Sequence, residues 1–170
     1  SSFRFVNNLP EEIQTKMLVR LGPGAEFGWS QAMRWQDRFP KIEIDTYRLK
    51  MTDLLQEARL AVYTYNSTGF LEAFSGGIPA ILFWDEIVSP LRSAAVPYFE
   101  DLKRVGIFHG SSESAARHVA AIWNNVEAWW QSQMVQDALN RFTAVYCRKP
   151  ANLLDSVEHI LREVMVTPEK

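Results

Sequence analysis

Short apolar runs alternate along the chain with longer stretches in which apolar residues recur every three or four positions. The short runs predict strands at residues 17–21, 42–45, 60–65, 79–84 and 106–109. The spacing predicts helices at residues 8–16, 52–59, 70–75, within 89–104, 112–146 (as two helices) and 151–164, with 25–40 irregular or weakly helical. The run at 79–84 is almost continuously apolar, which is typical of a strand covered on both faces.

This alternation predicts the fold class. Short strands that alternate with helices favour parallel βαβ units with right-handed crossovers. We therefore expect one α/β domain over residues 1–170, with an open, doubly wound, mostly parallel sheet of about five strands and a helical section from residue 112 to residue 170. In such sheets ligands bind beyond the carboxyl ends of the strands, so the loops after the predicted strands are the first place to look for a site.

The amino-acid composition and net charge narrow the classes of ligand and partner that the chain is expected to bind. Hydrophobic residues make up 47% of the chain and charged residues 22%, which are ordinary values for a globular domain. The net charge of −2 provides no basic face for nucleic acid or for an anionic membrane surface, so any anion must be held by a local group. The single cysteine, Cys147, excludes an internal disulfide and fits a reducing compartment. No apolar run approaches the ~20 residues that span a bilayer, and we expect a cytoplasmic protein.

The loop Asn66-Ser67-Thr68-Gly69 is the strongest candidate for binding chemistry. It follows a predicted strand and opens a helix directly, so N–H groups without intrahelical partners should face the carboxyl edge of the sheet. Two hydroxyls and a glycine beside the positive end of a helix suit a phosphate or a diphosphate. The alternative is that Ser67 or Thr68 simply caps its own helix, and both interpretations stay open at this point.

Other polar residues are weaker candidates. Glu72 lies one turn into the same helix, where its carboxylate is placed either to cap the loop N–H groups, to accept hydrogen bonds from a sugar or ribose hydroxyl, or to remain an ordinary surface carboxylate. His109, His118 and His159 are far apart and show no metal-ligand spacing, so we expect neither a metal nor a cofactor. Trp123 to Trp130 lie in a helical stretch, where they are expected to pack or to dock a partner.

Residues 67–81 carry a family resemblance. Ser67-Thr68-Gly69-Phe70-Leu71-Glu72-Ala73-Phe74-Ser75-Gly76-Gly77-Ile78-Pro79-Ala80-Ile81 resembles the S-x-x-x-x-E-A-x-x-x-G-x-P-x-I stretch of GT-B glycosyltransferases and nucleotide-sugar 2-epimerases. In those enzymes this stretch belongs to the C-terminal, Rossmann-like domain and faces the diphosphate or sugar of the donor. Stretches at 18–21, 83–85, 97–99, 106–107 and 123–130 are similar to poorly characterised transferases of bacterial surface-polysaccharide gene clusters.

The resemblance implies a donor site and an absent partner. Asn66, Ser67, Thr68 and Gly69 would hold the phosphates of a nucleotide-activated donor, and Glu72 would contact the sugar or ribose. Arg20 stands where related enzymes often carry a basic residue after the corresponding strand, and Arg92 follows a strand-end loop that would contact the donor. A surface arginine is the alternative at position 20. Ala80 stands where many retaining enzymes have the second glutamate of a Glu-x7-Glu pair, which disfavours that mechanism.

The domain organisation follows from the same resemblance. The chain begins Ser1-Ser2 without a methionine, and we expect a piece of a two-domain protein whose N-terminal, acceptor-binding domain is absent. The catalytic residues are unknown because the base would come from that domain, so the isolated chain is expected to be inactive. Peripheral membrane association of the full-length protein is compatible with this assignment. The alternatives are a nucleotide-sugar epimerase and a non-catalytic interaction module that docks through its tryptophan-rich helices.

Overall fold

Two short parallel sheets form the centre of the structure. The computed structural model describes residues 2–22, 30–147, 157–158 and 161–162. One sheet pairs β1 (Leu18–Arg20) with β2 (Glu43–Asp45), and the other has the order β3 (Ala61–Tyr63), β4 (Ala80–Phe83), β5 (Phe108–His109). Every pairing is parallel, as the alternation of strands and helices predicted.

The predicted five strands are all present, but they do not make the single sheet that we expected. The sheet of β1 and β2 and the sheet of β3, β4 and β5 are separate in their backbone hydrogen bonding within the described residues. Each strand is also shorter than its apolar run, with two to four residues in ladder pairing. An apolar run indicates a strand but not its neighbour, because pairing is decided by contacts between segments that are distant in sequence.

Helices occupy the connections and the C-terminal part. The described helices are α1 (Ser2–Asn7), α2 (Glu11–Gln14), α3 (Gln31–Arg38), α4 (Met51–Glu57), α5 (Gly69–Ser75), α6 (Val96–Arg104), α7 (Ser112–Ile122), the 3-10 turn η1 (Trp123–Asn125), α8 (Val126–Trp130) and α9 (Gln133–Tyr146). Helix α3 lies in the stretch that the sequence predicted to be irregular or weakly helical. It begins where the Ser30 hydroxyl accepts the Met33 N–H. The helix predicted at 151–164 lies outside the described residues, apart from four positions.

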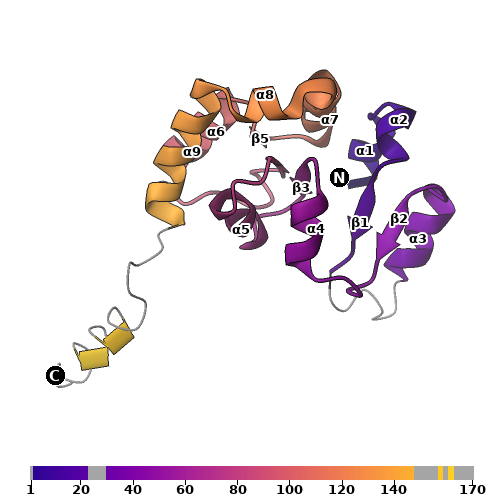
Figure 1. Cartoon of the computed structure of the whole chain (residues 1–170), viewed down its shortest axis with the longest axis horizontal. Helices are drawn as coiled ribbons and strands as arrows, with labels where there is room; N and C mark the ends of the chain where they lie inside the picture. The colour runs from indigo at the N-terminus through magenta and orange to yellow at the C-terminus, as the bar shows by residue number, and fades with distance from the viewer. Residues whose placement is uncertain (1, 23–29, 148–156, 159–160, 163–170) are drawn as a thin grey trace.

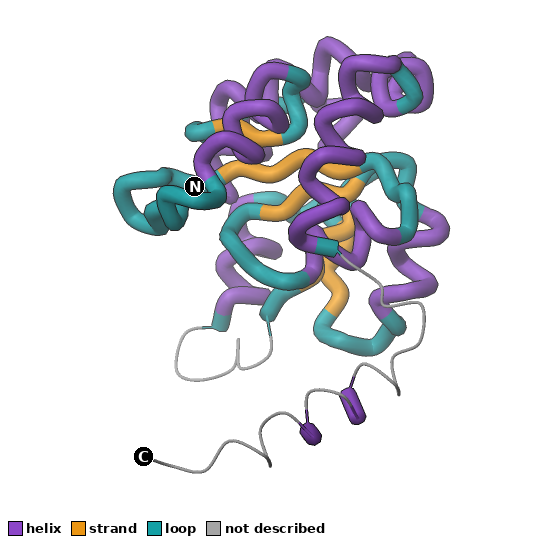
Figure 2. Tube along the Cα trace, turned by 90° about the vertical axis from the view of Figure 1, so that its left-hand side faces the viewer, coloured by secondary structure: helices purple, strands orange, loops and turns teal. Residues whose placement is uncertain are grey.

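The central strand β4 separates two hydrophobic cores. Ala80 and Leu82 face a core built with α5, α6 and α9, whereas Ile81 and Phe83 face a core built with α1 and α7. All four residues are buried, which confirms that the apolar run at 79–84 is covered on both faces. Figure 2 shows the strands lying between helices on both sides. This arrangement leaves the ends of the strands, rather than their faces, for a binding site.

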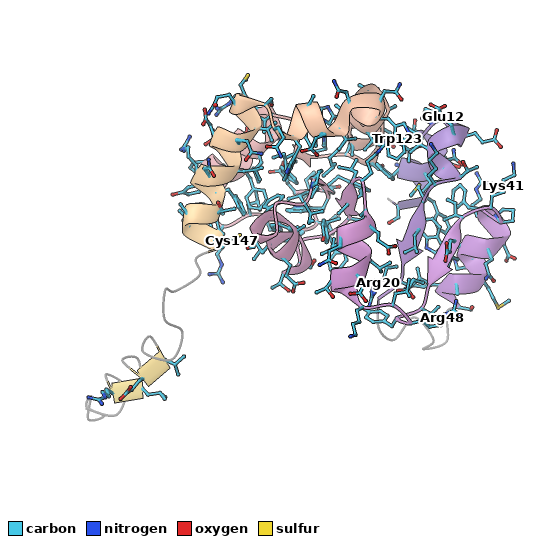
Figure 3. All side chains as sticks on the ribbon, viewed as in Figure 1. Glu12, Arg20, Lys41, Arg48, Trp123 and Cys147 are labelled. Atoms are coloured by element: carbon cyan, nitrogen blue, oxygen red, sulfur yellow. The ribbon has the colours of Figure 1, made fainter. Side chains whose placement is uncertain are left out.

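The tryptophans of the helical section pack inside the domain. Trp130 is 1% exposed, and its indole N–H donates to the carbonyl oxygen of Gly77 at 3.0 Å. The indole N–H of Trp129 donates to the carbonyl oxygen of Val105 at 3.0 Å. Trp123, labelled in Figure 3, lies beneath the guanidinium of Arg59, which is 5.2 Å from its ring centroid. These rings therefore hold the C-terminal helices onto the sheets, and they do not form an exposed docking face.

Candidate functional site

The loop after β3 presents polar groups that the protein itself does not use. Asn66 and Thr68 are exposed, and Ser67 and Gly69 are partly exposed. Thr68 precedes α5, but its side chain makes no capping hydrogen bond. Within the described part of the chain, neither the Ser67 and Thr68 hydroxyls nor the N–H groups of Gly69 and Phe70 have a hydrogen-bond partner. The helix-cap alternative for Ser67 and Thr68 is thus not what the structure shows, and these donors remain available to a ligand.

Gly69 allows the end of β3 and the start of α5 to approach closely. A Cβ atom at position 69 would lie 3.1 Å from Cε1 of Tyr63, closer than side chains normally pack. The Tyr63 ring also meets the ring of Phe70, with centroids 6.3 Å apart. Its hydroxyl is buried and has no hydrogen-bond partner in the described structure. Burial and the negative charge of Glu72 raise the pKa of Tyr63 to about 12, so this hydroxyl keeps its proton at neutral pH.

Glu72 is an exposed carboxylate on α5. It acts on Tyr63 through its charge, but among the described residues its side chain makes no hydrogen bond and does not cap the loop. Of the roles considered from the sequence, the capping role is therefore wrong. A contact with a ligand hydroxyl and an ordinary surface position both remain predictions.

Arg20 is the last residue of β1 and is strongly anchored. Its Nη1 atom lies 3.1 Å from Oδ2 of Asp45, the last residue of β2, and donates to the carbonyl oxygen of Leu49 at 2.8 Å. The guanidinium lies over the ring of Tyr47, 4.3 Å from its centroid. The Arg20 side chain is 16% exposed and that of Asp45 is 3% exposed. Arg20 is therefore not an ordinary surface arginine, although part of its charge is already balanced by Asp45.

Arg92 differs from Arg20 in having no anchor. It is exposed in the loop that leads into α6, and its side chain makes no hydrogen bond or ion pair with any described residue. No hydrogen bond or ion pair of the described structure joins either arginine to the loop at 66–69. Of the predicted residues, the loop at 66–69 and Glu72 thus lie together around Tyr63, whereas Arg20 and Arg92 stand at separate strand-end positions.

A cavity that sequence reasoning missed lies beside β5. Its volume is about 520 Å³, and its lining comes from the end of α6, the turn before β5, and helices α7, α8 and α9, including His109, Ser114, His118, Trp129 and Met134. His109 Nε2 lies 3.0 Å from the carbonyl oxygen of Gly106 and donates to it, so Nδ1 accepts from the Ser114 hydroxyl, also at 3.0 Å. Burial is the main reason that the pKa of His109 falls to about 4, so the ring is neutral at pH 7.

His118 completes one wall of this cavity. Its ring centroid lies 5.2 Å from that of His109 and 5.3 Å from that of Trp129. Its Nε2 is buried without a hydrogen-bond partner in the described structure, and burial lowers its pKa. The position of His109 at the end of a predicted strand was a sequence signal for part of this wall. The contact with His118 was not predicted, because the two histidines are nine positions apart in the sequence.

Comparison with known proteins agrees with the transferase resemblance at the level of family. The LIC12162 family transferase model matches residues 1–161 of the 170 residues. The chain belongs to this family. The match extends over each candidate residue from Arg20 to Arg92. No curated protein and no solved structure matches the chain.

Two further findings concern metal-binding groups and membrane spans. No three His, Cys, Asp or Glu side chains come together as a metal-binding group within the described residues. Over the same ranges, no helix has both the length and the apolar character that crossing a membrane requires. The candidate ligand contacts described above are hydroxyls, backbone N–H groups, arginines and a carboxylate, and the hydroxyls, N–H groups and arginines suit a polar anionic ligand.

Proposed function

We propose that this LIC12162 family member binds a nucleotide-activated sugar, or a related donor, for group transfer in bacterial surface-polysaccharide biosynthesis. The proposal rests on the hydroxyl and N–H donors beyond the end of β3, at Ser67, Thr68, Gly69 and Phe70, which have no hydrogen-bond partner among the described residues. Donors that are already fixed in place stabilise the charge that develops on a departing diphosphate. Membership of a transferase family supports the assignment of this loop to a leaving group.

The other candidate residues have complementary roles in this proposal. Positive charge for the phosphates comes from Arg20, held in place by Asp45 and Leu49, and from Arg92, which pairs with no described residue. Glu72, exposed one turn into α5, accepts hydrogen bonds from the sugar or ribose. The two sheets belong to the Rossmann-like half of a GT-B fold in a cytoplasmic enzyme, without a metal or a cofactor. The full-length protein associates with the membrane surface at most peripherally.

An N-terminal domain that binds the acceptor and supplies the catalytic base completes the proposed enzyme. The isolated chain should therefore bind nucleotide without turning it over. Group transfer by residues 1–170 on their own would contradict this part of the proposal. The interaction-module alternative loses its main support, because Trp129 and Trp130 use their indole N–H groups inside the domain.

The test of the proposed function is calorimetry with UDP, GDP, CDP and CMP. We expect one of them to bind saturably, and the double substitution Ser67→Ala, Thr68→Ala to weaken that binding at least tenfold, since hydrogen bonds to charged groups contribute about 1.5–3 kcal/mol each. Ser75→Ala is the matched control, because Ser75 is an exposed hydroxyl at the opposite end of α5. Binding that is unchanged by the double substitution, or no binding at all, would refute the proposed site.

A further inference from the structure

Tyr47 has an unusual backbone conformation in the turn that follows β2. It is the one non-glycine residue of the described structure with a positive φ, at 66°. The left-handed region costs an L-residue roughly 1–2 kcal/mol, so other contacts must hold Tyr47 there. One such contact comes from Asp45, whose Oδ1 accepts the backbone N–H of Arg48 at 2.9 Å and closes the turn.

Within the described residues, one charged side chain supports the Tyr47 ring. The guanidinium of Arg20 lies over the ring, and Arg20 is itself fixed by Asp45 and by the carbonyl oxygen of Leu49. Tyr47 is nevertheless 49% exposed. A strained backbone therefore holds a rigid aromatic ring partly in water, backed by a cation that is 16% exposed. Burial does not account for this arrangement, and strained positions of this kind are often found where a ligand binds.

The surroundings of Tyr47 suit one end of a nucleotide. A planar ring with a guanidinium on one face can stack a second planar ring on its other face, and such stacking accepts any base. Arg48 and Lys50 are exposed next to it, and neither forms an ion pair with a described residue. Figure 3 shows Arg20 and Arg48 at the end of the molecule where β1 and β2 finish. A base stacked there would lie next to positive charge that favours its phosphates.

We infer that Tyr47, backed by Arg20, is the stacking platform for the nucleobase of the donor. The inference rests on the proposed function and assigns a residue in the turn after β2, one of the strand-end loops in which the sequence predicted that a ligand would bind. Base and diphosphate are opposite ends of the ligand, so the platform after β2 and the hydroxyl loop after β3 can serve it together. Arg20 then has a positioning role as well as a charge, because it fixes the ring that meets the base.

The experiment compares two substitutions at position 47 and two probes. Tyr47→Asn replaces the ring with a side chain that tolerates a positive φ, so the turn is not strained further. Tyr47→Phe keeps the ring and is the matched control. The probes are the nucleotide that binds the unsubstituted chain best among UDP, GDP, CDP and CMP, and inorganic pyrophosphate, which has no base. We expect Tyr47→Asn to weaken nucleotide binding about tenfold or more, and to change pyrophosphate binding less than twofold. Tyr47→Phe should change neither.

The outcomes separate this inference from the proposed function. Nucleotide binding that is weakened by the Ser67→Ala, Thr68→Ala substitution but unchanged by Tyr47→Asn overturns the platform and leaves the proposed function intact. Equal losses for nucleotide and pyrophosphate also overturn the platform, because the effect would then act through Arg20 on phosphate. No nucleotide binding by the unsubstituted chain overturns both. Thermal melting of each variant shows whether a loss of binding is a loss of fold.

Discussion

Gly106 forms the turn between α6 and β5, and replacing it with alanine should be unusually destabilising. Its φ is 79°. Two backbone hydrogen bonds close the turn: the Gly106 N–H donates to the carbonyl oxygen of Lys103, and the Ile107 N–H donates to the carbonyl oxygen of Leu102. A Cβ atom here would lie 2.5 Å from Nε2 of His118 and nearer still to Cε1 of the same ring. His118 cannot withdraw easily, because its ring already packs against those of His109 and Trp129.

Two costs add up in Gly106→Ala. The left-handed backbone costs an L-residue about 1–2 kcal/mol, and a forced overlap in a packed region costs about 1–3 kcal/mol more. We therefore expect the free energy of unfolding to fall by about 2–5 kcal/mol. Gly77→Ala is the matched control, since Gly77 has φ 71° but a Cβ there would meet nothing within 4 Å. The control should lose only the backbone cost of about 1–2 kcal/mol.

Urea unfolding followed by circular dichroism measures both variants. A second test adds His118→Ala to the Gly106→Ala chain. Removing the ring should be less destabilising there than in the unsubstituted protein, because it also relieves the overlap. Equal destabilisation by Gly106→Ala and Gly77→Ala would refute the steric part of this reasoning.

Three further predictions concern burial. Burial lowers the pKa of His109 from its ordinary value of 6.5 to about 4 in the folded chain, so the unfolded chain binds more protons between these pH values. The free energy of unfolding should therefore fall by up to about 3 kcal/mol as the pH drops from about 6.5 to about 4. Urea midpoints against pH test this, and His109→Gln should flatten the profile. Asp101 is 6% exposed and forms ion pairs with Arg104 and Arg141. Replacing both arginines with alanine leaves this buried carboxylate unpaired, so the free energy of unfolding should fall by about 2 kcal/mol more than the sum of the two single substitutions. Additive losses in a double-mutant cycle would contradict this. Trp130→Ala should lose about 3–5 kcal/mol in urea unfolding and Trp130→Phe much less, because phenylalanine still fills most of the buried volume. Similar losses would contradict this, and would mean that the indole N–H bond to Gly77, which both substitutions remove, sets the cost.

Much of the secondary structure followed from local pattern. All five strands were predicted from short apolar runs, and the start of α5 after Asn66-Ser67-Thr68 was placed within one residue. Helix α3 was only partly predicted, as an irregular or weakly helical stretch, although Ser30 is a good capping residue and its hydroxyl accepts the Met33 N–H. The capping alternative at Thr68 shows the reverse case, in which a good capping residue makes no cap.

The sequence by itself determined the α/β class, the position of each strand and the polar loop that follows β3, because these depend on the order of apolar and turn-forming residues along the chain. Only the tertiary structure decided which strands pair, that Asp45 fixes Arg20 against the ring of Tyr47, and that His118 packs next to Gly106 and His109. These contacts join residues nine to twenty-seven positions apart. Their formation depends on packing in three dimensions, for which a single sequence carries no local signal.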